Sequence, residues 1–214
     1  MEADVIQRIA VFALPVLFAI TLHEAAHGYL ALRCGDRTAL WAGRITLNPV
    51  KHIDPIGTVL VPLLLYFTTS GSFLFGWAKP VPVDFSRLNQ PKRDIRYVAF
   101  AGPAANLIMA VMWAIFYKLQ LTAGLQEPFF LEMAKAGILV NLGLAALNLL
   151  PILPLDGGRI LFSYLPAKLA YNYSRSEQYG IIILMILLMT RVLDALMLPF
   201  VKAGVGILST LFNL

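Results

Sequence analysis

Two histidines four residues apart flank a glutamate near the end of the first long apolar segment: His23, Glu24 and His27, in the letters HEAAH. On a helix, positions i and i+4 lie on one face, so both imidazoles can reach a single zinc ion. A glutamate directly after the first histidine can reach a water beside the metal and act as a general base. Uncompensated polar side chains in a bilayer cost about 2 to 4 kcal/mol each. Three of them on one apolar helix therefore favour a metal site over a chance pattern.

A hydrolytic zinc site usually has three protein ligands and one water, so HEAAH needs an acidic or histidine partner elsewhere. The best candidate is Asp156, which lies in the segment NLLPILPLDGG at residues 148–158 and is predicted to end an apolar helix. The prolines of this segment break the helix hydrogen-bond ladder, and its paired glycines permit a tight turn beside a metal. By itself the segment is more typical of a helix stop and a turn. The other acids in the apolar stretches lie near the ends of those stretches: Glu2, Asp4, Glu132 and Asp194.

The elements that must position these residues are membrane helices. Of the 214 residues, 59% are hydrophobic and 14% are charged, and the mean hydropathy is +0.74, which excludes a soluble globule of ordinary surface. Apolar stretches of about 20 residues, long enough to cross a bilayer, recur along the chain. We predict an all-α polytopic membrane protein, one domain over residues 1–214, with about 4 to 6 transmembrane helices. The predicted spans are residues 5–32, 95–121, 130–151 and 179–198, with an interrupted stretch at 56–75 and a short one at 201–214.

The net charge of +5 is explained by basic residues in the connections on one side of the membrane. Basic residues concentrate in three connections, which marks a cytoplasmic face by the positive-inside rule. No aromatic-interleaved RNA-binding motif accompanies them, so we expect no nucleic-acid partner. The single cysteine, Cys34, excludes an intramolecular disulfide. The residues of the three connections are Arg33, Arg37, Arg44 and Lys51; Lys79, Arg87, Lys92, Arg93 and Arg96; and Arg159, Lys168 and Arg175.

If the two ligand segments share one metal, their helices must run parallel and end on the same, cytoplasmic side. The N-terminus then lies outside, and the stretch at 56–75 must cross the bilayer an even number of times. We predict that this stretch is re-entrant and turns near residues 68–72. Asp54 followed by Pro55 indicates that a helix starts there, because aspartate is a good N-cap and proline suits the first helical position.

The sequence resembles the site-2 protease family of intramembrane zinc metalloproteases, in its compact bacterial and archaeal forms without a PDZ domain. The resemblance rests on HEAAH at 23–27, GRITLN at 43–48 running into PVKHIDPIG, FGWAKPVPV at 75–83, AGPAAN at 101–106 and NLLPILPLDGG at 148–158. It implies one zinc ion per chain, held by His23, His27 and Asp156. It also implies that Glu24 activates the water and that Asn148 lies near the scissile carbonyl as a positioning or oxyanion-stabilising donor.

The family likeness also implies a membrane-dipping strand or loop from Gly43 to Asn48. Alternation of polar and apolar residues in this segment independently predicts a short β-strand, whose edge could pair with an unwound substrate. We take Gly43 and Asn48 as candidate substrate contacts, with a turn-forming role for Asn48 about equally supported. His52 is a candidate accessory residue of the active site or gate, although an ordinary polar loop residue is the better-supported interpretation.

The expected function is zinc-dependent hydrolysis of peptide bonds in a membrane-spanning protein or peptide near the cytoplasmic face. The expected location is the plasma or inner membrane of a prokaryotic cell, with the lipid bilayer as surroundings. Two alternatives are a membrane protein that binds or transports metal and a catalytically silent scaffold. A transporter needs polar residues along a path through the bilayer, and the predicted spans have only one such cluster.

Overall fold

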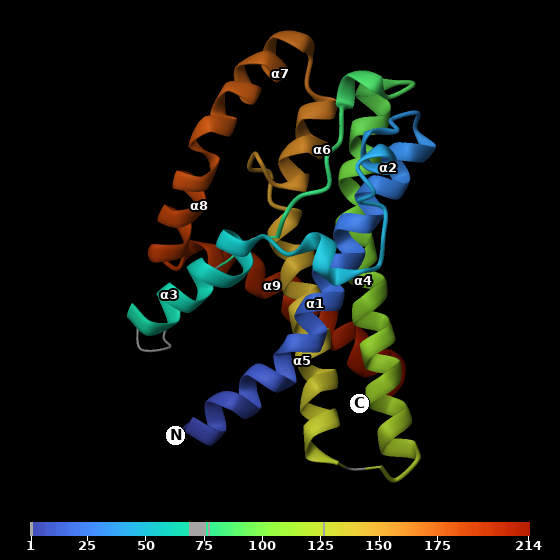
Figure 1. Cartoon of the computed structure of the whole chain (residues 1–214), viewed down its shortest axis with the longest axis vertical. Coiled ribbons are helices and arrows are strands. Elements are labelled where there is room, and N and C mark those ends of the chain that lie inside the picture. Colours follow the sequence, from blue (N-terminus) through green and yellow to red (C-terminus); the bar gives the residue numbers. More distant parts are fainter. Residues whose placement is uncertain (1, 69–75, 77, 126) are drawn as a thin grey trace.

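The computed structural model describes residues 2–68, 76, 78–125 and 127–214 as helices and irregular connections (Figure 1). The α-helices are α1 (Glu2–Arg33), α2 (Thr38–Trp41), α3 (Val61–Thr68), α4 (Pro91–Thr122), α5 (Pro128–Asn148), α6 (Asp156–Tyr164), α7 (Ala167–Ser174), α8 (Gly180–Met189) and α9 (Val192–Phe212). The short helical turns are η1 (Pro49–His52), η2 (Pro55–Leu60), η3 (Phe85–Arg87) and η4 (Arg175–Tyr179).

Four helices of the described residues are long and apolar enough to cross a membrane. They are the Ile9–Arg33 part of α1, α4, α5 and α9. This agrees with the predicted polytopic helical architecture, and the chain is an integral membrane protein.

The helices α1, α4 and α5 form the bundle that carries the site. Helices α4 and α5 pack as an antiparallel hairpin. Asn106 of α4 pairs with Asn141 of α5, while Gln120, nearer the connecting turn, donates to the carbonyl of Phe130. Helix α4 is also antiparallel to α1, since Val98 faces His27 and Asn106 faces His23. Therefore α1 and α5 run parallel, toward the end of the molecule that carries α6 and α7 (Figure 1).

An apolar core fills the bundle at the end away from α6 and α7. Trp113 of α4 packs against α5 so closely that a Cβ on Gly137 would lie 2.3 Å from the indole. Leu208 of α9 joins this core, and Gly204 lets α9 approach Leu142 in the same way. The three-helix bundle and the last helix thus share one core.

The predicted span at 179–198 is wrong. Helix α8 ends at Met189 after 10 residues, about 15 Å, which is half of the hydrocarbon thickness. The break comes at Thr190 and Arg191, and Arg191 adopts the left-handed conformation with φ of 59°. The residues beyond it join the predicted short stretch at 201–214 in one long helix, α9.

The predicted β-strand at 43–48 is also wrong, because the described residues contain no strand. Arg44 is buried and donates to the carbonyl of Lys79, so the loop after α1 packs on the segment at 78–83. That segment contains Pro80 and Pro82, which have no N–H to donate to a sheet ladder. The two segments therefore pack together without forming a sheet.

The predicted helix start at Asp54 and Pro55 is confirmed. The Asp54 carboxylate accepts hydrogen bonds from the backbone N–H groups of Ile56 and Gly57, and η2 begins at Pro55 and continues into α3. Helix α3 ends at Thr68. Apart from that residue, the predicted re-entrant turn at 68–72 lies outside the described residues.

Candidate metal centre

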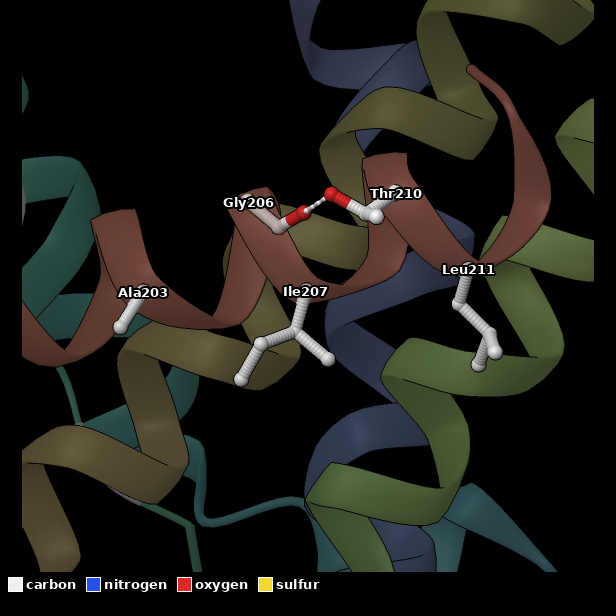
Figure 2. Close-up of a pocket in the computed structure, with 5 residues that line it drawn as sticks. All are labelled: Ala203, Gly206, Ile207, Thr210 and Leu211. Carbon is white, nitrogen blue, oxygen red and sulfur yellow. Dashed lines mark hydrogen bonds between the residues drawn. The ribbon is translucent and has the colours of Figure 1, made fainter.

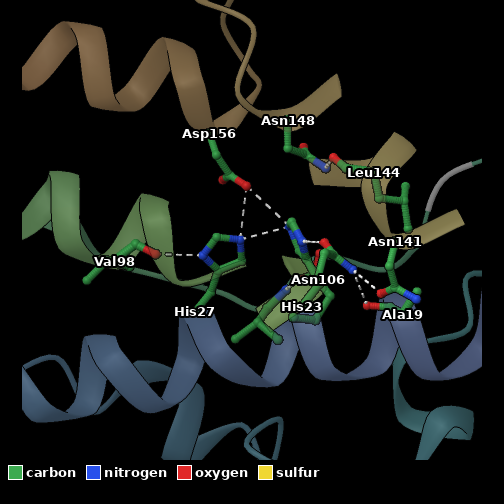
Figure 3. Close-up of polar contacts among 11 residues, drawn as sticks. Ala19, His23, His27, Val98, Asn106, Asn141, Leu144, Asn148 and Asp156 are labelled. Atoms are coloured by element: carbon green, nitrogen blue, oxygen red, sulfur yellow. Dashed lines mark hydrogen bonds and ion pairs between the residues drawn. The ribbon is translucent and has the colours of Figure 1, made fainter. Parts of the chain in front are cut away.

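The structure brings the three predicted metal ligands together, although Asp156 lies far from the two histidines in sequence (Figure 3). The Nε2 atoms of His23 and His27 lie 3.0 Å apart. Asp156 Oδ2 lies 3.2 Å from the first of these nitrogens and 3.3 Å from the second. Three donor atoms thus converge on one point at the side of α1 that faces α4 and α6.

Hydrogen bonds on the far side of each imidazole decide which nitrogen carries the proton. His27 Nδ1 lies 2.7 Å from the backbone carbonyl of Val98, which can only accept. His23 Nδ1 lies 2.6 Å from Oδ1 of Asn106. In its neutral form each ring therefore carries its proton on Nδ1, which leaves the Nε2 lone pair available toward the other Nε2 and Asp156 Oδ2.

This arrangement fits a divalent cation. Asp156 Oδ2 is buried and has no hydrogen-bond donor among the described residues. Two imidazole nitrogens and a carboxylate oxygen that converge on one point are the ligand set of a catalytic zinc site. A bound cation would compensate the three groups together.

Gly102 of α4 provides the space for this convergence. A Cβ at this position would lie 2.4 Å from His27 Nε2 and 2.5 Å from His23 Nε2. Only glycine lets the helix backbone pass so close to both nitrogens. The motif AGPAAN at 101–106 is part of the family likeness, but the sequence predicts no role for Gly102 or Asn106. Val98, Gly102 and Asn106 follow one another at intervals of four residues. This spacing indicates that they share one helix face.

Asp156 does not end a helix as predicted, because α5 stops at Asn148 and Asp156 is the first residue of α6. The intervening residues 149–155 contain two prolines, which interrupt the helix ladder. Gly157 lies in the first turn of α6, where a Cβ would lie 2.3 Å from the carbonyl oxygen of Leu149. The paired glycines thus permit close packing of α6 on the proline loop.

Residues of the segment at 164–180 support the same loop from outside. The Tyr173 hydroxyl donates to the carbonyl of Pro151 at 3.0 Å. Arg159 of α6 forms an ion pair with Glu177. A Cβ on Gly180 would collide with the backbone of residue 153, so α8 also begins directly against the loop. This polar segment therefore anchors the chain on either side of Asp156.

The predicted general base, Glu24, lies between the two histidines in sequence and is half-buried. Its Oε2 accepts a hydrogen bond of 2.7 Å from the backbone N–H of Val81. Its Oε1 accepts none from the described residues, so that oxygen is available to a proton donor. Asn148, the predicted substrate-positioning residue, is the last residue of α5, and its Nδ2 donates to Leu144 O at 3.0 Å (Figure 3).

The other predicted site residues lie in the loop after α1. Gly43 is exposed with φ of 61°, a turn conformation that favours glycine. Asn48 is exposed and caps η1, accepting from Val50 N at 3.1 Å. His52 is buried, with Nε2 3.0 Å from Thr46 O, and it is not part of the metal-ligating group found among the described residues.

A shallow groove on α9 offers no comparable chemistry (Figure 2). Its one polar side chain, Thr210, donates back to the carbonyl of Gly206 at 2.9 Å within the same helix. The remaining lining residues are Ala203, Ile207 and Leu211.

An apolar helical bundle that joins HExxH to a distant aspartate is the arrangement of a membrane-embedded metallohydrolase. The model of peptidase family M50 matches residues 122–190. The chain is 34% identical over 207 residues to "Putative zinc metalloprotease YwhC" of Bacillus subtilis (strain 168), covering 92% of this chain and 89% of that protein. It is 32% identical over 182 residues to "Putative zinc metalloprotease Rip2" of Mycolicibacterium smegmatis, covering 83% of this chain and 66% of that protein. No solved structure matches. The chain therefore belongs to the site-2 protease family of zinc metalloproteases, peptidase family M50.

Proposed function

We propose that this protein is an intramembrane zinc endopeptidase that cleaves membrane-spanning proteins or peptides near the cytoplasmic face. The observation that carries the proposal is the triangle of His23 Nε2, His27 Nε2 and Asp156 Oδ2, with Glu24 on the same helix as the two histidines. The names of the relatives and the family membership support a zinc metalloprotease.

The ligands of one zinc ion would be His23, His27 and Asp156, and the zinc would supply Lewis acidity when bound. Glu24 would take a proton from the attacking water at Oε1 and deliver it to the leaving amide nitrogen. The Val81 N–H holds Oε2, which orients the carboxylate during both transfers. Asn148 would use its amide N–H not bonded to Leu144 to stabilise the developing oxyanion.

Several finer features belong to the same proposal. The basic connections flank the ends of α1 and α6, which would place the centre toward the cytoplasm of a prokaryotic plasma or inner membrane. Gly43 and Asn48, both exposed in the loop after α1, would contact an unwound substrate segment. Cleavage of this kind would serve regulated intramembrane proteolysis.

The test is cleavage of a single-span reporter protein by the purified enzyme in detergent, comparing wild type with Glu24→Gln. The substitution keeps an acceptor for the Val81 N–H but removes the base, so we expect zinc content to stay constant and the rate to fall about 10²- to 10⁴-fold. Glu132→Gln is the matched control, because Glu132 is exposed and its ion-pair partner among the described residues is Lys135. Undiminished cleavage by the Glu24 variant would refute the proposal, and metal uptake into vesicles without cleavage would favour a transporter.

A further inference from the structure

We infer that Asn106, held by Asn141, is a positioning residue that determines which nitrogen of His23 faces the metal. The inference rests on the proposed zinc site and adds two residues that lie outside HEAAH and the proline segment. Both asparagines are fully buried, in α4 and α5.

All three helices of the bundle meet at Asn106 (Figure 3). Its Oδ1 accepts from His23 Nδ1 at 2.6 Å. Its Nδ2 donates to the carbonyl of Ala19 at 3.2 Å and to Oδ1 of Asn141 at 3.0 Å. Asn141 in turn donates to the carbonyl of Gly137 at 2.8 Å. The chain of hydrogen bonds therefore runs from backbone carbonyls to the ligand imidazole.

The anchors matter because an amide can present either of its ends to a histidine. If the Asn106 amide were reversed, its NH₂ group would face Nδ1 of His23, and the ring would place its proton on Nε2, the nitrogen aimed at the metal. The carbonyl of Ala19 and the oxygen of Asn141 both require a donor, so they exclude the reversed orientation. His27 needs no such device, because its partner is a backbone carbonyl that can only accept.

Asn141 also links this orientation to the placement of α5. That helix ends at Asn148 and leads into the loop before Asp156. The same hydrogen bond that orients Asn106 thus joins α4 to the helix that leads to the third ligand.

The first readout is zinc affinity, measured by competition with a chelator. We expect Asn106→Leu to weaken zinc binding about 10- to 100-fold and Asn141→Leu to weaken it by a smaller factor. Asn106→Asp should stay within a few-fold of wild type, because either form of the carboxyl group still accepts from His23. Gln120→Leu is the matched control: it removes a buried amide from the same helix, away from His23, and should leave affinity unchanged.

The second readout needs no metal. The chain has only three histidines, so ¹⁵N NMR of histidine-labelled, zinc-free protein resolves each ring. We expect an Nδ1–H form for His23 and an Nε2–H form for His52, which donates to Thr46 O. In Asn106→Leu, only His23 should shift toward the Nε2–H form.

Wild-type zinc affinity together with an unchanged His23 tautomer in Asn106→Leu would overturn the inference. Should that variant fail to fold, equal losses of affinity in Asn106→Asp and Asn141→Leu would overturn it instead, since the aspartate keeps the acceptor. If wild type bound no zinc, the proposed function would fail, while the tautomers would still decide the role of Asn106.

Discussion

The Glu24 carboxylate and the Val81 backbone N–H are joined by a hydrogen bond of 2.7 Å across 57 residues of sequence. The segment that supplies this N–H is itself fixed by two contacts at Lys79, whose carbonyl accepts from Arg44 and whose N–H donates to the carbonyl of His52. The loop after α1 therefore positions the proposed general base through the segment at 78–83.

Replacing Val81 with proline should slow cleavage without releasing zinc. Proline removes the one N–H that holds Glu24 Oε2, and a hydrogen bond to a charged group contributes about 1.5 to 3 kcal/mol. We expect kcat to fall about 10- to 100-fold while zinc content, measured by atomic emission, stays at the wild-type value.

Val81→Ala is the control, because it shortens the side chain but keeps the N–H. It should retain most of the wild-type kcat. Equal kcat in the proline variant and wild type would show that Glu24 does not depend on this contact.

A methyl group at Gly102 should exclude the metal. The added Cβ would lie 2.4 to 2.5 Å from the two ligand nitrogens, so at least one imidazole must move. We expect Gly102→Ala to lose zinc, although alanine favours a helix over glycine by about 1 kcal/mol.

Gly143→Ala separates the two effects. Gly143 lies within α5, and a Cβ there meets nothing within 4 Å. This variant should bind zinc normally and unfold at the same or a higher temperature. Full zinc occupancy in the Gly102 variant would contradict the described packing of α4 on the histidines.

The sequence predicts the ligand set more readily than the residues around it. Spacing places His23 and His27 on one helix face, and the positions of the acidic residues along the apolar stretches make Asp156 the best partner. The roles of Gly102 and Asn106 depend on how α4 docks against α1, and no local pattern specifies that register. The same holds for Val81, whose contribution is a backbone N–H.

The break between α8 and α9 had no sequence signal of the usual kind. Left-handed residues at helix ends are commonly glycine or asparagine, whereas here the residue is Arg191. An unbroken apolar run from 179 to 198 was therefore the natural interpretation. Residues 43–48 alternate as a strand does, but the neighbouring segment carries two prolines, and a strand needs a partner with free N–H groups.

Labelling from each side of the membrane tests the predicted orientation. Ser86 and Thr122 are exposed and lie before and at the end of α4, so they belong to opposite faces. We expect Ser86→Cys to react with an impermeant maleimide only from the cytoplasmic side and Thr122→Cys only from outside. The reverse pattern would place the metal centre at the external face.

The native thiol should contribute little background to that experiment. Burial, together with the nearby Asp94 carboxylate, raises the pKa of the Cys34 thiol. A raised pKa leaves less thiolate at neutral pH, and the thiolate is the reactive form. The unmodified protein should therefore label slowly, and a rate matching that of Ser86→Cys would contradict this account of Cys34.

The most direct test of the central claim is the zinc stoichiometry and affinity of the purified protein compared with Asp156→Ala. If His23, His27 and Asp156 hold one metal ion, wild type should contain one zinc per chain. The variant, which keeps both histidines, should bind zinc at least about 10-fold more weakly. Zinc bound as tightly by the variant as by wild type would contradict the three-ligand centre, and with it the proposed pairing of α1 with the proline segment at one catalytic site.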